Sequence, residues 1–199
     1  MVTLVVKAFN KLKWVVPVVK RLTLVLCLLA PLGARAGEMV VQDFDKGPQD
    51  PGLTGTFQDD KGSTVNWRFK ENSKRKGDWF FAFQYLMKAN GSCGFWCRAG
   101  DGSDGQDWGK HSALVFHLFS KSQVALKVSF TDSLGRVFEA TAPTAGGSGK
   151  WEKVTVPLSG FKAEEGGGAP ALEAVRSVTF SPQNPNRAWF AIDKLVLAE

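Results

Sequence analysis

Short apolar runs separated by clusters of turn residues make up most of the chain after residue 36. Within many runs apolar and polar positions alternate, which is the pattern of a strand with one buried face, and no long segment repeats with the period of a helix. The clusters between the runs are rich in Gly, Asp, Asn and Pro, which favour turns. The pattern predicts strands near residues 39–44, 53–58, 64–70, 79–88, 94–98, 113–119, 123–131, 136–141, 151–157, 174–180 and 189–197.

The runs differ in how many of their faces are apolar. Within residues 123–131, every second residue from Val124 is apolar and the positions between are mostly polar. Residues 79–88 are apolar on both faces, which indicates either a central, covered strand or a platform of aromatic rings. Many short strands in one chain of this length predict an all-β, two-sheet antiparallel β-sandwich over residues 37–199.

The first 36 residues have the three parts of an export signal. A basic stretch ends at Lys20–Arg21, an apolar run follows over Leu22–Leu32, and a small-x-small site stands at Ala34–Ala36. The apolar run is about half of the roughly 20 residues that a membrane-spanning helix needs. We therefore predict that residues 1–36 are a cleaved signal peptide, with an uncleaved anchor as the alternative, and that the rest is exported to the periplasm or outside the cell. No membrane contact is expected after cleavage.

The charge of the chain lies in this leader. The formal net charge is +6, but the first 36 residues hold six of the 25 basic residues and none of the 19 acidic ones. Residues 37–199 therefore carry 19 charges of each sign. A nucleic-acid binder is expected to show an excess of basic residues, so this class is excluded.

Residues that would support catalysis are few. The chain has two histidines and no G-x-S-x-G motif, so the sequence gives little support for a catalytic triad of nucleophile, histidine and acid. The adjacent acids Glu164 and Glu165 stand in a glycine-rich loop rather than on a strand that could pair carboxylates across a glycosidic bond. The sequence predicts a protein that is not an enzyme.

Two cysteines follow the leader, Cys93 and Cys97. Cysteines of exported proteins often pair, but positions four apart in one unbroken strand lie about 13 Å apart, which is too far for a bridge. A disulfide between them therefore requires a turn at Gly94. We predict this disulfide, with two buried thiols as the alternative. A zinc site has little support because only His111 and His117 remain as nitrogen ligands.

Four segments, in order along the chain, resemble the galactose-binding-like jelly roll, and in particular family 11 carbohydrate-binding modules and complex I intermediate-associated proteins. The segments are Val41–Asp45 (VQDFD), residues 114–142, Gly149–Phe161 (GKWEKVTVPLSGF) and the closing pair Val178–Phe180 and Phe190–Leu197. The resemblance covers residues 39–197. It implies a two-sheet jelly roll with a ligand cleft on a concave sheet, although this fold serves many functions.

Aromatic rings can stack on the apolar faces of sugars, while polar side chains bind the hydroxyl groups. The candidate rings lie beside turns or on a strand face that the pattern does not assign to core or solvent. They are Trp79, Tyr85, Trp96 and Trp108. For each of them, burial in the core is the alternative. We interpret Trp67, Trp151 and Trp189 as core residues. The resemblance implies that the hairpin carrying Asp132 and Arg136 contributes to the cleft; the alternative is that both charges are solvated beside a tight turn.

The resemblance also implies a structural calcium ion, held by acids near the first strand and in the last. In this sequence the matching residues are Asp43 or Asp45, together with Asp193. Carboxylate oxygens are suitable ligands for calcium, and a buried Asp193 needs some partner. A hydrogen bond from a backbone amide is the alternative.

These observations predict an exported, non-catalytic module that binds a β-glucan-like polysaccharide on its concave sheet. Two other functions remain open. One is a protein-interaction or assembly factor that uses an apolar patch on the same scaffold, with a protein as its partner. The other is an exported glycan-active enzyme.

Overall fold

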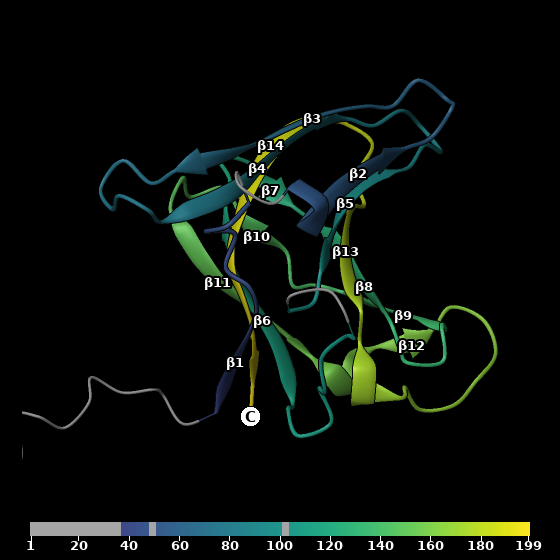
Figure 1. Cartoon of the computed structure of the whole chain (residues 1–199). Helices are drawn as coiled ribbons and strands as arrows, with labels where there is room; N and C mark the ends of the chain where they lie inside the picture. Colours follow the sequence, from purple (N-terminus) through teal and green to yellow (C-terminus); the bar gives the residue numbers. More distant parts are fainter. Residues whose placement is uncertain (1–36, 48–50, 101–103) are drawn as a thin grey trace, which may run out of the picture. The chain divides into compact units, whose positions relative to one another are not determined.

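The computed structural model describes residues 37–47, 51–100 and 104–199. The predicted signal peptide, residues 1–36, lies outside the described residues. Gly37–Glu199 forms one compact unit, built from two large sheets that pack face to face (Figure 1). No helix in the described part of the chain is long and apolar enough to cross a membrane.

The first sheet, here called sheet A, has the strand order β11-β6-β14-β4-β3, and β1 pairs with the far half of β14. Its strands are β1 (Glu38–Gln42), β3 (Thr64–Glu71), β4 (Trp79–Leu86), β6 (Ala113–Phe119), β11 (Trp151–Pro157) and β14 (Arg187–Ala198). Every pairing is antiparallel. The twelve-residue β14 therefore joins the two halves of the sheet.

The second sheet, sheet B, has the order β12-β9-β8-β13-β5-β2 and is also antiparallel. Its strands are β2 (Thr54–Gln58), β5 (Cys93–Arg98), β8 (Leu126–Thr131), β9 (Val137–Thr141), β12 (Lys162–Ala163) and β13 (Ser177–Pro182). The remaining elements are the pair β7 (Gln123–Val124) and β10 (Ala145–Gly146) and three short 3-10 turns, η1 (Pro51–Leu53), η2 (Leu158–Gly160) and η3 (Leu172–Ala174). The predicted all-β, two-sheet antiparallel sandwich is confirmed.

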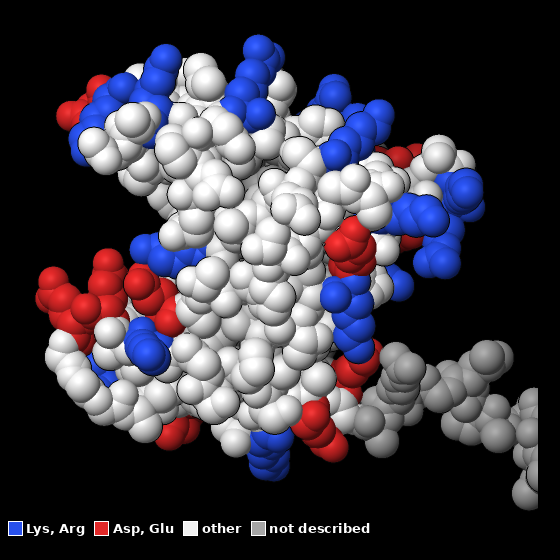
Figure 2. All heavy atoms as spheres, turned by 180° about the vertical axis from the view of Figure 1, so that it is seen from behind, with Lys and Arg blue, Asp and Glu red and all other residues white. Residues whose placement is uncertain are grey.

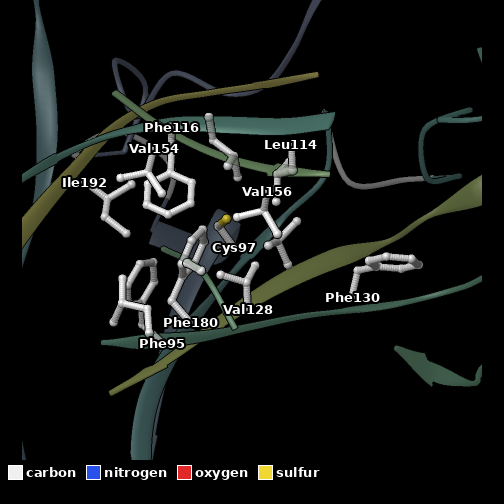
Figure 3. Close-up of a cluster of buried hydrophobic side chains, with 14 of the residues drawn as sticks. Phe95, Cys97, Leu114, Phe116, Val128, Phe130, Val154, Val156, Phe180 and Ile192 are labelled. Atoms are coloured by element: carbon white, nitrogen blue, oxygen red, sulfur yellow. The ribbon is translucent and has the colours of Figure 1, made fainter. Parts of the chain in front are cut away.

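The core between the sheets is built mainly from aromatic rings. Phe95 of β5 stacks on Phe180 of β13 with ring centroids 5.0 Å apart, and Phe81 of β4 approaches Phe95 to 4.5 Å from the other sheet. Figure 3 shows Phe95 and Phe180 beside Phe116 of β6 in this cluster. Each fully buried ring of this size contributes about 1.5–3 kcal/mol through removal of apolar surface from water. The packing of rings from both sheets fixes how the sheets face each other.

The predicted disulfide is wrong. Strand β5 runs unbroken through both cysteines, so Cys93 and Cys97 each point into the core and their thiols are free. Gly94 is part of the regular strand and pairs with Phe57, whose ring lies over it: a Cβ on Gly94 would lie 2.7 Å from that ring. Burial raises the pKa of Cys97 to about 12, which keeps this thiol protonated and unreactive.

The two ends of the described chain lie side by side. Glu38 at the start of β1 pairs with Ala198 at the end of β14, and the Glu199 amide donates a hydrogen bond of 3.2 Å to the Gly37 carbonyl (Figure 1). The β1–β14 pair forms only beyond a bulge in β14, where Lys194 has a positive φ of 50°. This bulge separates the part of β14 that pairs with β4 from the part that pairs with β1.

Candidate functional site

A groove of about 400 Å³ runs over the outer face of sheet B. One wall is formed by Phe57 and by the segment from Met87 to Cys93, and the other by residues that include Val137 and Glu164. Figure 2 shows the groove as a deep hollow, with acidic side chains gathered on its lower lip. The groove is therefore open to solvent and crosses several strands.

Short polar side chains form the floor of the groove. Ser129 of β8 and Thr179 and Ser181 of β13 point outward because their neighbours in each strand point into the core. Thr179 pairs in register with Ser129 on one side and with Trp96 on the other. Small residues on this row leave room for a ligand to approach the sheet closely.

Two aromatic rings lie over glycines at one end of this face. Trp96 is the register partner of Gly55, and a Cβ on Gly55 would lie within 2.5–2.7 Å of three atoms of the indole, so the ring covers that glycine. Phe57 is the register partner of Gly94 and covers it in the same way. Each of the strands β2 and β5 thus contributes one aromatic ring that lies over a glycine of the other strand. Phe57 is 36% exposed and Trp96 is partly exposed.

Charged groups mark the other end of the groove. Lys127 Nζ and Glu139 Oε2 form an ion pair of 2.9 Å across β8 and β9, and both side chains are about one-third exposed. Glu164 and Gln183 line the groove nearby. The groove thus combines a neutralised charge pair, an amide and hydroxyl groups, all of which can exchange hydrogen bonds with a polar ligand.

The four predicted ligand rings are not brought together. Trp96 lies on the groove face, but Tyr85 and Trp108 are only 2% and 0% exposed, so neither offers a ring face to a ligand and the prediction is wrong for both. Tyr85 packs against Phe83 and Phe190, and burial raises the pKa of its hydroxyl to about 12. Tyr85 and Trp108 are thus core residues, which was the alternative to ligand stacking.

Asp132 is buried and serves the fold. Its carboxylate accepts hydrogen bonds from the backbone amides of Leu134, Arg136 and Ala171, and the Arg136 guanidinium donates two more at 2.9 and 2.7 Å. Arg136 also donates to the Ala169 carbonyl. The prediction that Asp132 binds a ligand is therefore wrong, and Arg136 is committed to the same network.

Burial of Asp132 would on its own raise its pKa. The backbone hydrogen bonds from Ala171, Arg136 and Leu134, and the Arg136 side chain, favour the ionised form and outweigh burial, so the pKa lies below its ordinary value. The carboxylate therefore stays charged and holds the β8–β9 turn against the segment before η3.

The three predicted calcium ligands each accept a backbone hydrogen bond. Asp43 Oδ1 accepts from the Asp45 amide, Asp45 Oδ1 accepts from the Trp79 amide at 2.7 Å, and Asp193 Oδ1 accepts from the Lys194 amide at 2.8 Å. Trp79, the fourth predicted ring, therefore stands at the start of β4 in sheet A and not in the groove. The amide alternative for Asp193 is present in the structure.

Asp193 is nevertheless placed among other carboxylates. Burial, together with the charges of Asp78 and Asp45, raises the pKa of Asp193 to about 6. Among the described residues, no three His, Cys, Asp or Glu side chains lie close enough together to hold a metal ion. Calcium takes six to eight oxygen ligands, so an ion here would need backbone or water oxygens beside Asp193 and Asp45.

Other aromatic residues at the surface were not predicted. Trp151 and Trp189, interpreted from sequence as core, are 40% and 38% exposed on the outer face of sheet A, so that interpretation is wrong. Phe57 was not singled out at all. The sequence feature that could have indicated Phe57 is the Gly-x-Phe spacing in β2. This spacing predicts a ring at the surface only when Gly94 of β5 is known to be its register partner.

Among the comparisons with known proteins, only the one with solved structures found matches, and these concern the fold. No family model and no curated protein match the sequence. Among solved structures, the family 11 carbohydrate-binding module of a Clostridium thermocellum cellulosomal cellulase aligns with a TM-score of 0.59 and 18% identity, over 83% of this chain and 96% of that one. The family 11 module from Clostridium thermocellum in complex with a β-1,3-1,4-mixed-linked tetrasaccharide aligns with a TM-score of 0.60 and 18% identity, over 83% and 97%.

A third structure has the same architecture. The family 30 carbohydrate-binding module of another Clostridium thermocellum cellulosomal cellulase aligns with a TM-score of 0.53 and 11% identity, over 74% of this chain and 91% of that one. Similarity at these low identities establishes the arrangement of strands. The chain has a two-sheet jelly-roll fold similar to that of family 11 carbohydrate-binding modules.

Proposed function

We propose that the protein is a non-catalytic carbohydrate-binding module whose sheet B groove holds a β-glucan-like polysaccharide. The observation that carries the proposal is the pair of rings, Trp96 and Phe57, each seated on a glycine of the neighbouring strand. Partly exposed aromatic rings on a sheet present an apolar surface that matches the C–H face of a pyranose. Burial of that surface on both partners favours binding.

The rest of the groove fits a polar chain. The hydroxyls of Ser129, Thr179 and Ser181 and the Lys127–Glu139 pair offer both donors and acceptors to sugar hydroxyl groups. A groove that crosses several strands has room for consecutive sugar units. The similar family 11 module whose solved structure contains a mixed-linked β-1,3-1,4 tetrasaccharide supports a β-glucan as the ligand.

The proposal of a non-catalytic role rests on the residues in the groove. No histidine, cysteine thiolate or G-x-S-x-G serine lines it among the described residues. Cys93 borders the groove, but burial raises its pKa to about 11. This thiol is therefore not an activated nucleophile.

Affinity electrophoresis of the purified protein tests the proposal. Native gels would contain mixed-linkage β-glucan, xylan, mannan or no polysaccharide. We expect the β-glucan gel to retard the wild-type protein and not Trp96→Ala, while Trp151→Ala, which removes an exposed tryptophan from the opposite sheet, migrates like the wild type. Equal mobility of the wild type in all gels would contradict the proposal, as would retention of Trp96→Ala provided that both variants melt like the wild type.

We also propose that residues 1–36 direct export and are then removed. The support is the order of a basic, an apolar and a small-residue segment in the sequence. Expression in a bacterial host followed by fractionation and N-terminal sequencing is the test. A periplasmic or secreted protein that begins at Gly37 is the expected result, and a cell-bound protein that retains Met1 would contradict cleavage.

A further inference from the structure

The outer face of sheet A carries a second pocket, separate from the groove. Trp189 of β14 borders it and stacks on Phe119 of β6 with ring centroids 5.5 Å apart and an angle of 23° between the rings. In sheet A, β14 lies between β6 and β4, so Phe119 is on one side of Trp189 and the pocket is on the other. One face of an indole that is 38% exposed is therefore directed to the pocket.

The strand register explains the shape of this pocket. Ala82 of β4 is the partner of Arg68, and the small alanine makes the floor. Gln84 is the register partner of both Asn66 and Trp189, so the two side-chain amides and the indole lie in one row across the strands, beside that floor. The pocket has a volume of about 220 Å³.

A second cavity extends the same surface toward the other end of β3 and β4. It has a volume of about 350 Å³, shares Asn66 and Gln84 with the first, and adds Arg187. Together the two cavities form a continuous surface, here called the sheet A face, along β3 and β4.

The charges on the sheet A face are all positive and unpaired. Arg68, Lys70 and Arg187 line it, and no Asp or Glu among the described residues does. Within the described part of the chain, no side-chain hydrogen bond or ion pair engages Arg68, Asn66 or Gln84. All three residues are exposed on this face.

The groove on sheet B has the opposite character. There, Lys127 is neutralised by Glu139, and Glu164 adds negative charge to the lip. The acidic lip and the neutralised ion pair of the groove favour an uncharged ligand. The unpaired arginines of the sheet A face favour a negatively charged group, which a guanidinium can hold with two hydrogen bonds. The two faces therefore differ in the charge that they present to a ligand.

We propose that the sheet A face is a second binding site, and that it takes an acidic polysaccharide. Trp189 stacks on a pyranose ring, Arg68 and Arg187 bind carboxylate or sulfate groups of the sugar, and Asn66 and Gln84 bind its hydroxyls. A nucleic-acid chain is a weaker fit because residues 37–199 carry equal numbers of basic and acidic residues. Combined with the proposed function of the groove, this site allows one molecule to hold a neutral and an acidic chain on opposite faces.

Affinity electrophoresis with acidic polymers tests the site. Gels contain polygalacturonate, dextran sulfate or uncharged dextran, so that carboxylate and sulfate recognition are separated. We expect at least one acidic polymer to retard the wild-type protein, and Arg68→Ala and Trp189→Ala each to weaken its affinity about tenfold or more. Retardation should decrease with added salt. Arg176→Ala removes an exposed cation outside both cavities and should behave like the wild type.

Several results would overturn this proposal. They are unchanged mobility in both acidic gels, equal effects of Arg68→Ala and Arg176→Ala, stronger binding of a single-stranded oligonucleotide than of either acidic polymer, or a dimer in light scattering that Trp189→Ala dissociates. Trp96→Ala separates the two proposed sites, because it should abolish β-glucan binding and leave binding of the acidic polymer unchanged. Failure of the groove and failure of the sheet A face are thus distinguishable.

Discussion

The indole of Trp96 lies across the backbone of Gly55, its register partner on the neighbouring strand. The ring can approach this backbone closely because residue 55 has no side chain. The glycine therefore determines the orientation of the ring, and through it the surface offered to a sugar. This dependence gives a test that leaves the ring itself in place.

Replacing Gly55 with alanine should weaken β-glucan binding about tenfold, because the new Cβ would lie 2.5 Å from the indole and the ring must tilt away. Titration calorimetry of wild type and variant measures the difference. Gly160→Ala is the matched control, since a Cβ at Gly160 meets nothing within 4 Å and should leave affinity unchanged. An equal affinity of Gly55→Ala and wild type would show that this ring does not contact the sugar.

Asp132→Asn should lower the free energy of unfolding by about 3 kcal/mol, because it removes the charge that Arg136 and three backbone amides bind. Urea denaturation monitored by tryptophan fluorescence measures the change. Asp60→Asn, at an exposed position, should have almost no effect. A loss of similar size in both variants would contradict the role assigned to Asp132.

The same carboxylate makes stability depend on pH. The pKa of Asp132 is lower in the folded than in the unfolded protein, so its contribution is fully present above the ordinary pKa of 3.8 and is lost as pH falls below that value. Melting temperatures of wild type and Asp132→Asn measured at neutral pH and at about pH 3 should therefore converge on acidification. A constant difference between the two proteins would disprove this linkage.

Cys93 and Cys97 should both be free and unreactive in the folded protein, because burial raises their pKa values to about 11 and about 12. Iodoacetamide should label them only after denaturation, as peptide mass mapping would show. A reductant should leave the melting temperature unchanged. A peptide mass with the two cysteines linked, or a melting temperature lowered by reductant, would contradict the structure.

Calcium binding beside Asp193 and Asp45 predicts that excess calcium raises the melting temperature and that EDTA lowers it. The physical reason is that a cation would relieve the repulsion that helps to raise the pKa of Asp193. Asp193→Asn should remove the difference between the two conditions. Identical melting curves of the wild-type protein in calcium and in EDTA would exclude the ion.

Periodicity located the strands well where one face is buried. Residues 113–119 were predicted and observed as β6, and 151–157 as β11. The predicted run 123–131 instead divides into β7 and β8, because Val124 pairs with Ala145 in a separate two-stranded ribbon. Alternation of side chains is a property of one strand and does not identify its partner.

The site was harder to predict because it depends on which strands are neighbours. Asp132 has the residue type of a ligand-binding group, but only the fold shows that its oxygens are occupied by amides and Arg136. Trp151 and Trp189 have the residue type of a core, but register places them on an outer face. Residue type alone therefore did not show where these side chains lie in the fold.

The pairing of Glu38 with Ala198 determines how the domain responds to a mechanical load. Tension applied between the two chain ends pulls β1 and β14 apart from their shared end, so the hydrogen bonds of this pair open one after another instead of being sheared together. The load thus acts first on the hydrogen bonds between β1 and β14.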